Sequence, residues 1–364
     1  MIGRNSSGGG NPDGSINFGQ RPFSHLPSTD FKAWSTANLP EPTIKNPTDY
    51  FNSVLYTANA TAGKTVTGVG FSPDLFWAAR LNANGASSAI VDTVRGVGKT
   101  LNVAYADDYE TEDGVTSFDA DGVTLGATWP NAGNGDSWVA WNWKESATAG
   151  FDMFSYTGTG SNPQTRAHSL GVTPEMIIVK SLDSGESDQH WVTYHHKSNA
   201  TPQNYWARLN TNGPFEDLEI WNDTAPTSSI FTTQNHAITN ANGSTFIAYL
   251  WASVEGYSKV GSYVGNNSSD GPFIYTGFKP AWFMVKNIAN GESWEVYDNA
   301  RDPNNVTTSR LQVDTNNGEA TSTFVDFVSN GIKHRNTSGG HNNNGGTFIY
   351  LAFAESPFKY ANAK

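Results

Sequence analysis

The sequence predicts an all-β protein built from three tandem β-sandwich-like units of about 100 residues each, preceded by an extended N-terminal arm. One observation is the composition, in which 13% of residues are aromatic and 15% are charged, with 36 Gly and 17 Pro. Aromatic side chains suit half-buried pleated surfaces, while Gly and Pro supply turns. A second observation is that no window keeps Leu, Lys, Glu and Ala at helical spacing. The third is an internal repeat.

The repeat begins with Gly, two residues, Pro and a hydrophobic run. This anchor occurs as GFSPDLFWA from Gly70, GVTPEMIIV from Gly171 and GFKPAWFMV from Gly277. The three copies follow one another at intervals of about 100 residues, which is the behaviour expected of a repeated supersecondary unit. We therefore expect a strand after each Pro, buried on both faces.

Two further anchors recur in the same order. A central strand and a closing strand follow each Gly-x-x-Pro segment, and each closing strand is preceded by an Asn-rich and Gly-rich turn, as in NAGNGD, NANGS and NNNGG. The matching segments are Trp191–Tyr194 with Trp294–Tyr297, Asp92 and Arg95 with Asp298 and Arg301, and the closing strands from Gly135, Gly243 and Gly345. The shared period predicts an arm over residues 1–49 and units over 50–147, 148–253 and 254–364.

Shorter sequence features predict the structure within the units and of the N-terminal arm. The segment Ser117–Gly126 alternates around an Asp-Gly pair and predicts a hairpin. Several short strands with turns between them favour a sandwich over a propeller, because a propeller blade needs only about 45 residues and three blades would not close a ring. The first fourteen residues are rich in Gly, Ser and Asn and predict a flexible tail, and residues 24–49 predict an extended connector.

Charge and composition exclude several classes of partner and cofactor. The formal net charge of −12 repels nucleic acid. The absence of cysteine removes disulfides and thiolate metal sites and fits synthesis in a cytosol. No apolar run approaches the roughly 20 residues of a membrane helix, so we expect no membrane insertion, and the N-terminus lacks a signal-peptide core.

Three segments match the motifs of phosphate-binding or metal-binding sites only in part. RGVGKT, from Arg95, lacks the first Gly of a phosphate-binding loop. The acidic stretch from Asp107 to Asp113 could collect calcium, but it lacks the ligand spacing of a known calcium loop and favours a solvated turn. His195 and His196 are adjacent on a strand and cannot share one metal. We therefore expect no catalytic residue, metal or cofactor.

Tryptophans are the most informative residues. Those on repeated positions predict core packing: Trp138, Trp143, Trp191, Trp251 and Trp294. Trp129, Trp206 and Trp221 have no counterparts in other units and lie among Pro, Asn and Thr. Aromatic rings beside amides and hydroxyls suit sugar rings, so these three are the predicted ligand-binding residues. Packing in loops or interfaces is the alternative for them.

Several strings together resemble a known family. NFGQRPF from Asn17, ANLPEPTI from Ala37, GFSPDL, SFDADGVTLG, SWVAWNW and the C-terminal AFAESPFKYANAK resemble a repeat family of tail-associated proteins of marine and freshwater bacteriophages, including cyanophages. In that family NFGQRPF looks like the last strand of a SPRY-type sandwich, which would be shortened here or supplied by another polypeptide. The resemblance implies concanavalin- or jelly-roll-type units and a role in virion structure or host attachment.

The resulting functional hypothesis is a non-enzymatic virion protein, synthesised in the host bacterial cytoplasm, that forms part of a tail fibre or attachment appendage and adheres to host-surface glycan. The arm would bind other virion proteins, and the chain would form a homo-oligomer, with a trimer as the expectation for a fibre. Tandem sandwiches would make a rigid rod whose loops contact the host. A capsid decoration or head fibre with a structural role is one alternative, and a carbohydrate-active enzyme with paired carboxylates is another.

Overall fold

The computed structural model describes residues 38–82, 88–107, 110–183 and 189–361. The flexible tail and the NFGQRPF string of the predicted arm lie outside these residues. From Pro42 onward the chain forms one compact unit, distinct from Met1–Glu41. The division of this compact unit into three at residues 147 and 253 stays a prediction.

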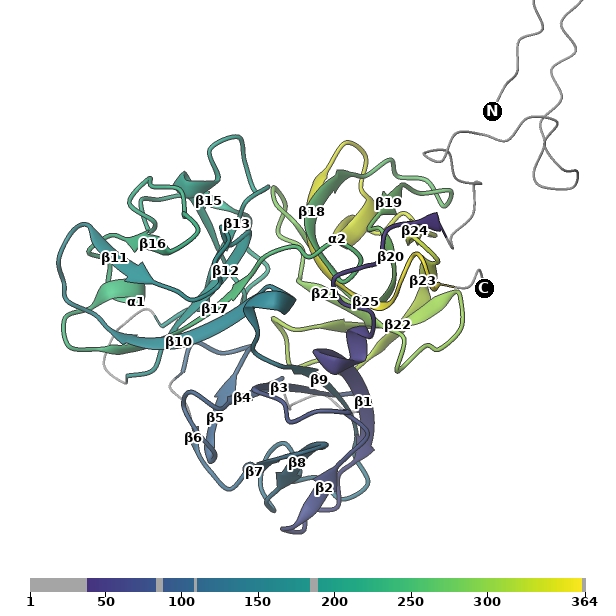
Figure 1. The fold of residues 1–364 in the computed structure, drawn as a ribbon, viewed down its shortest axis with the longest axis horizontal. Helices are drawn as coiled ribbons and strands as arrows, with labels where there is room; N and C mark the ends of the chain where they lie inside the picture. Colours follow the sequence, from purple (N-terminus) through teal and green to yellow (C-terminus); the bar gives the residue numbers. More distant parts are fainter. Residues whose placement is uncertain (1–37, 83–87, 108–109, 184–188, 362–364) are drawn as a thin grey trace, which may run out of the picture. The chain divides into compact units, whose positions relative to one another are not determined.

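The first part of the chain forms a six-stranded sheet in the order β1-β9-β3-β4-β5-β6 and a smaller sheet in the order β2-β8-β7 (Figure 1). A short 3-10 helix, η2 (Pro47–Asp49), leads into β1. The strands are β1 (Phe51–Thr57), β2 (Lys64–Val66), β3 (Leu75–Arg80), β4 (Ala89–Asp92), β5 (Lys99–Asn102), β6 (Glu110–Thr111), β7 (Val115–Asp119), β8 (Gly122–Leu125) and β9 (Ser137–Trp143). The predicted hairpin over Ser117–Gly126 is confirmed as β7 and β8.

The second part repeats this arrangement, with a sheet in the order β10-β17-β12-β13-β14-β15 and a two-stranded sheet β11-β16. Its elements are η3 (Ala147–Ala149), β10 (Phe151–Thr157), β11 (Gln164–Ala167), β12 (Met176–Ser181), β13 (Val192–His195), η4 (Pro202–Asn204), β14 (Tyr205–Arg208), β15 (Glu216–Asp217), β16 (Ile230–Thr233), α1 (Ala237–Asn240) and β17 (Thr245–Trp251).

The third part forms an eight-stranded sheet in the order β18-β25-β20-β21-β22-β23-β24-β19. Its elements are β18 (Ser258–Val264), β19 (Phe273–Tyr275), β20 (Phe278–Asn287), β21 (Glu295–Asp298), β22 (Thr307–Gln312), β23 (Ala320–Val328), β24 (Gly331–His334), α2 (Gly339–Asn342) and β25 (Thr347–Pro357). The chain is thus all-β and β-sandwich-like, as the composition predicts. Within the described residues, no helix has the length and apolar character needed to cross a bilayer.

All three main sheets begin with the same order of strands. An opening strand pairs with the closing strand, which pairs with the strand of the Gly-x-x-Pro segment, which pairs with the central strand. In register, Leu75 pairs with Trp143 and Asp92, and Met176 pairs with Trp251 and His195. Trp282 occupies this place in the third sheet, where it pairs with Phe353 and Asp298.

The strands after the prolines are buried on both faces, as predicted. Pro73 and Pro174 stand just before β3 and β12. Pro280, however, lies inside β20, against the expectation that each Pro begins a strand. The register of β20 against β25 shifts on either side of Pro280, and such a bulge accepts a residue without an N–H donor.

The two faces of each main sheet pack against different cores. Along β9, for example, Val139 and Trp141 point into one hydrophobic cluster, and Trp138 and Ala140 into another. The first cluster takes side chains from all three main sheets, whereas the others are specific to one sheet each and lie under its own outer strands. The sheets therefore surround one shared core, and they do not form a row of sandwiches with separate interiors (Figure 1).

Aromatic contacts hold the shared core together. The indole of Trp282 lies 5.6 Å from that of Trp143 and 6.0 Å from that of Trp141, both edge-on. The rings of Phe51 and Phe353, from the first and third sheets, stack at 4.8 Å. Edge-to-face and offset geometries at these centroid distances are those that aromatic pairs prefer.

Polar side chains bridge the sheets inside this apolar core. The Trp141 indole N–H donates to Asp298 Oδ2 at 3.0 Å, and the Tyr249 hydroxyl donates to Asp92 Oδ2 at 2.6 Å. His195, which holds the place of these aspartates in the second sheet, has its Nε2 3.2 Å from the Tyr350 carbonyl oxygen. Each sheet thus contacts both of the others, and the three contacts close a ring.

A second kind of bridge joins each of two sheets to the preceding part of the chain. It consists of a buried lysine and a tryptophan, and it occurs twice. Lys180 Nζ, in the second part, donates to the carbonyl of Ala106 in the first part. Lys286 Nζ, in the third part, donates to the carbonyl of Asn212 in the second part. Beside them, the indoles of Trp191 and Trp294 donate to the carbonyls of Asn102 and Arg208 at 3.1 and 3.0 Å. Bonds from buried lysines to carbonyl oxygens offset part of the cost of burying the ammonium groups.

The Asn of each predicted turn before a closing strand has a structural role beyond the turn. Asn131, Asn240 and Asn342 open the three Asn-Gly segments, and all three are fully buried. Asn131 Nδ2 donates to the carbonyls of Gly126 and Thr61 at 2.6 and 3.0 Å, and Oδ1 accepts from the Asn59 amide at 2.9 Å. Asn240 and Asn342 hold the corresponding loops, because they accept from Thr159 and Asn266 amides.

Replacing Asn131 by Ala should lower the free energy of unfolding by about 1–3 kcal/mol, because it leaves buried backbone groups without partners. Urea denaturation at neutral pH measures the change. The matched control is Asn199→Ala, at an exposed position whose side chain accepts from the neighbouring Ala200 amide. Equal losses in the two variants would contradict the proposed role of the buried amide.

Tyr249→Phe should also destabilise the protein, by about 1–2 kcal/mol, because it removes a hydrogen bond to a charged, buried acceptor and keeps the ring. Tyr275→Phe, which removes the hydroxyl of a residue 61% exposed, is the control. If thermal unfolding of the two variants coincides, the Tyr249–Asp92 bond contributes nothing to joining the first and second sheets.

Candidate functional site

Two of the three tryptophans predicted to bind a ligand lie inside the protein. Trp206 and Trp221 are 1% and 2% exposed and belong to the outer core of the second sheet. The Arg208 guanidinium covers the Trp206 ring at 4.2 Å, and the Trp221 indole donates to the Tyr205 carbonyl at 3.2 Å. With both rings covered, neither can stack on a sugar in this fold, which corrects the expectation for these two residues.

Trp129 is half-buried and packs against the outer core of the first sheet. The carbonyl oxygen of Trp129 lies so close to Gly114 that a side chain at position 114 would clash with it. The glycine therefore allows the two backbone segments to approach each other. A ligand contact by Trp129 stays a prediction. The five tryptophans on repeated positions, by contrast, are confirmed as core residues, with exposures of 0–3%.

Two of the residues weighed as metal ligands, His195 and Asp113, have structural surroundings. His195 is fully buried, and desolvation, with the neighbouring His196, lowers its pKa to about 3. In the acidic stretch, Asp113 accepts from the amides of Ala127 and Thr128, and hydrogen bonding from Thr128 and Ala127 lowers its pKa. Asp108 lies outside the described residues. Among the residues that are described, no three His, Asp or Glu side chains are grouped to hold a metal ion.

A buried polar network occupies the third sheet. Glu295 accepts from Arg310 at 2.8 Å and from the Tyr297 hydroxyl at 2.6 Å, and it lies 2.8 Å from His341 Nδ1. Burial alone would raise the pKa of Glu295, but the bonds from His341 and the charge of Arg310 hold it below its usual value. Glu295 and His341 are at most 1% exposed, so the network joins α2 to the sheet and is closed to a substrate.

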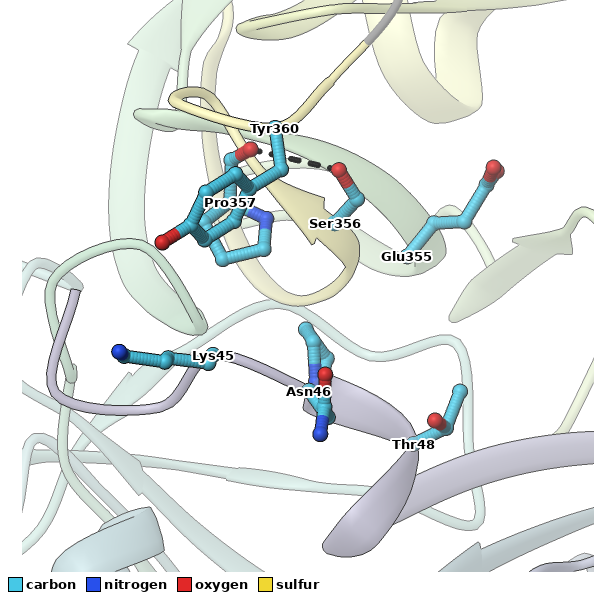
Figure 2. A pocket seen from close by; sticks show the side chains of 8 residues that line it. Lys45, Asn46, Thr48, Glu355, Ser356, Pro357 and Tyr360 are labelled. Atoms are coloured by element: carbon cyan, nitrogen blue, oxygen red, sulfur yellow. Dashed lines mark hydrogen bonds between the residues drawn. The ribbon is translucent and has the colours of Figure 1, made fainter. Parts of the chain in front are cut away.

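An open depression of about 470 Å³ lies where the two ends of the compact unit meet. Its lining residues, shown as sticks in Figure 2, come from two segments: Lys45, Asn46, Pro47 and Thr48, and Glu355, Ser356, Pro357 and Tyr360. The two segments face each other across the gap, with Tyr360 beside Pro357. Sequence reasoning missed this site, because nothing in either segment indicates that they meet.

The depression combines apolar surfaces with fixed polar groups. Glu355 is held in place by Lys279 at 2.5 Å and by the Asn299 amide at 2.9 Å. The Tyr360 side chain is 45% exposed. Among the eight lining residues Glu355 is the one carboxylate, whereas glycoside hydrolysis needs a pair. This lining therefore holds no pair of carboxylates.

A different pair of carboxylates lies at the junction between the first and second sheets. Desolvation and a hydrogen bond with Asp152 raise the pKa of Glu145 to about 7, although the Met153 amide opposes the shift. In the unfolded chain this carboxyl has the ordinary value near 4.5. Protonated Glu145 therefore adds full stability below pH 4.5, and that contribution is lost as the pH rises through about 7.

We expect Glu145→Gln to flatten the pH dependence of stability between about pH 4.5 and 7, because glutamine stays neutral throughout. Wild type should lose stability relative to the variant across this window, measured as urea midpoints at several pH values. Glu255→Gln, on an exposed position, is the control and should leave the wild-type profile unchanged. Parallel profiles for wild type and Glu145→Gln would refute the raised pKa of Glu145.

Comparison with known proteins places the chain in a family. No curated protein matches the chain in sequence. Residues 46–357 match a family described as a domain of unknown function, DUF7483. This span begins at the residue before η2 and ends with β25, so it contains all three main sheets with their outer strands. The chain therefore belongs to the DUF7483 family.

Proposed function

We propose that this chain is a non-enzymatic structural protein of a bacteriophage virion, part of a tail fibre or other attachment appendage that adheres to host-surface glycan. The observation that carries the proposal is the closed ring of three β-sheets around one aromatic core, bridged by buried polar side chains at equivalent positions. Such a ring is a rigid scaffold for surface loops, and loops on rigid scaffolds are where binding residues concentrate.

Three further features support this proposal. The sequence resembles tail-associated phage proteins over nearly its whole length. Two ion pairs, Arg95–Asp92 and Arg301–Asp298, are buried in the interior, with side chains 0–2% exposed. A net charge of −12 gives no attraction to an anionic cell envelope, so adhesion would rest on aromatic contacts and hydrogen bonds, which are the contacts that sugars make.

A structural role on the virion, as a capsid decoration or head fibre, is favoured by a different surface. Phe273 and Tyr275 on β19 are 49% and 61% exposed, while Ile274 between them is buried. β19 is also an edge strand of the eight-stranded sheet. Exposed aromatics on an open edge are suited to packing against another virion protein.

Imaging virions with antibody against this chain, together with an adsorption assay, tests the proposal. We expect antibody on the tail, and purified protein should slow phage adsorption to host cells in a dose-dependent way. The heat-unfolded protein at the same concentration is the control. Antibody on the head with unchanged adsorption would overturn the attachment role and favour the structural one.

A further inference from the structure

The three junctions between sheets are built alike, but one of them is interrupted. A backbone amide at or near the end of each closing strand donates to the residue that precedes its opening strand. The three bonds run from Lys144 to Tyr50, from Ala252 to Gly150 and, inside β25, from Ala354 to Tyr257. From the first sheet to the second, the chain passes directly through Glu145 and η3 into β10. From the second to the third, residues 253–257 make the same passage.

The junction from the third sheet back to the first has no covalent connection. Glu355 stands at the place of Glu145, and η2 stands at the place of η3, but they belong to opposite ends of the compact unit. Among the described residues no segment crosses this junction, and an open space remains. It is the depression lined by Lys45, Asn46, Thr48, Glu355, Ser356 and Tyr360, with two prolines (Figure 2).

We propose that this junction is a saccharide-binding site that takes a neutral hexose unit of a glycan. This inference rests on the proposed adhesive function and gives it a location. The residues concerned differ from the tryptophans that the sequence favours, two of which are buried.

The lining groups match the chemistry of a sugar ring. Lys359 Nζ lies over the Tyr360 ring at 6.0 Å from its centroid, farther than the 4.2 Å of Arg208 from the Trp206 ring, and Tyr360 remains 45% exposed. Its ring and the prolines beside it therefore offer apolar surface to the C–H face of a pyranose. The amide of Asn46 and the hydroxyls of Thr48 and Ser356 can donate and accept at the hydroxyl rim. Ser356 makes a 3.3 Å bond to the Pro357 carbonyl, which a ligand hydroxyl can replace.

Charge and size narrow the ligand class. The one carboxylate of the lining, Glu355, is already neutralised by Lys279, so it does not favour a basic sugar, and a neutral hexose is the ligand that its acceptor oxygens and the surrounding amide and hydroxyl groups suit. Lys279 and Asn299 hold the Glu355 carboxylate in a fixed orientation as an acceptor. A volume of about 470 Å³ lies in the usual range for small-ligand sites and fits one or two sugar rings.

Saturation-transfer NMR on the full chain tests the site, with methyl glucoside, methyl galactoside and N-acetylglucosamine as neutral probes and glucuronate and glucosamine as charged ones. We expect at least one neutral probe to receive saturation. Tyr360→Ala should weaken its binding by about tenfold, the size of a lost aromatic contact. Tyr275→Ala, which removes another exposed tyrosine, is the matched control. Asn46→Ala is the second variant and should also weaken binding.

The outcomes separate this inference from the proposed function. Neutral-sugar binding that is lost in Tyr360→Ala and kept in Tyr275→Ala supports the site. Binding that is equal in wild type and both site variants places the sugar elsewhere and overturns the inference. A preference for a charged probe, or saturation of none, overturns it as well. In each of these cases the adsorption assay still decides the attachment role independently.

Discussion

The shared aromatic core is the constraint on which the rest of the structure depends. Trp282 touches Trp141 and Trp143 of the first sheet and Phe353 of its own. Because one face of every main sheet is covered by the other two, no sheet could keep that face dry alone. Burial of so much aromatic surface is the main favourable contribution to folding here, and it makes the three sheets cooperative.

Burying polar groups in such a core is costly unless each has a partner. Asp92 accepts from Arg95 as well as from Tyr249, and Asp298 accepts from Arg301 as well as from Trp141. These bonds are directional, whereas hydrophobic contacts are not. They therefore fix how the sheets are rotated against one another, and the buried lysines fix the neighbouring loops in the same way.

The ring also explains where a binding site can form. Two junctions are filled by continuous chain, and the third brings together residues near 46 and near 357. Its depression lies where the described part of the chain closes into a ring without a connecting peptide. The ends of the family match fall at the same place, so the open junction lies at the limits of the matched domain.

The sequence by itself determined the all-β class, the order of the anchors, the strands buried on both faces and the five core tryptophans, because periodicity and strand propensity are local. It did not determine what covers those strands. Trp206 and Trp221 lack counterparts because each sheet has its own outer core, so an unrepeated aromatic is not thereby an exposed one. Likewise Asn131 looks like a turn residue, and its burial depends on a loop 70 residues away. Only the tertiary structure decided that the sheets share a core and that the two ends of the compact unit meet, because both depend on contacts between residues far apart in the chain.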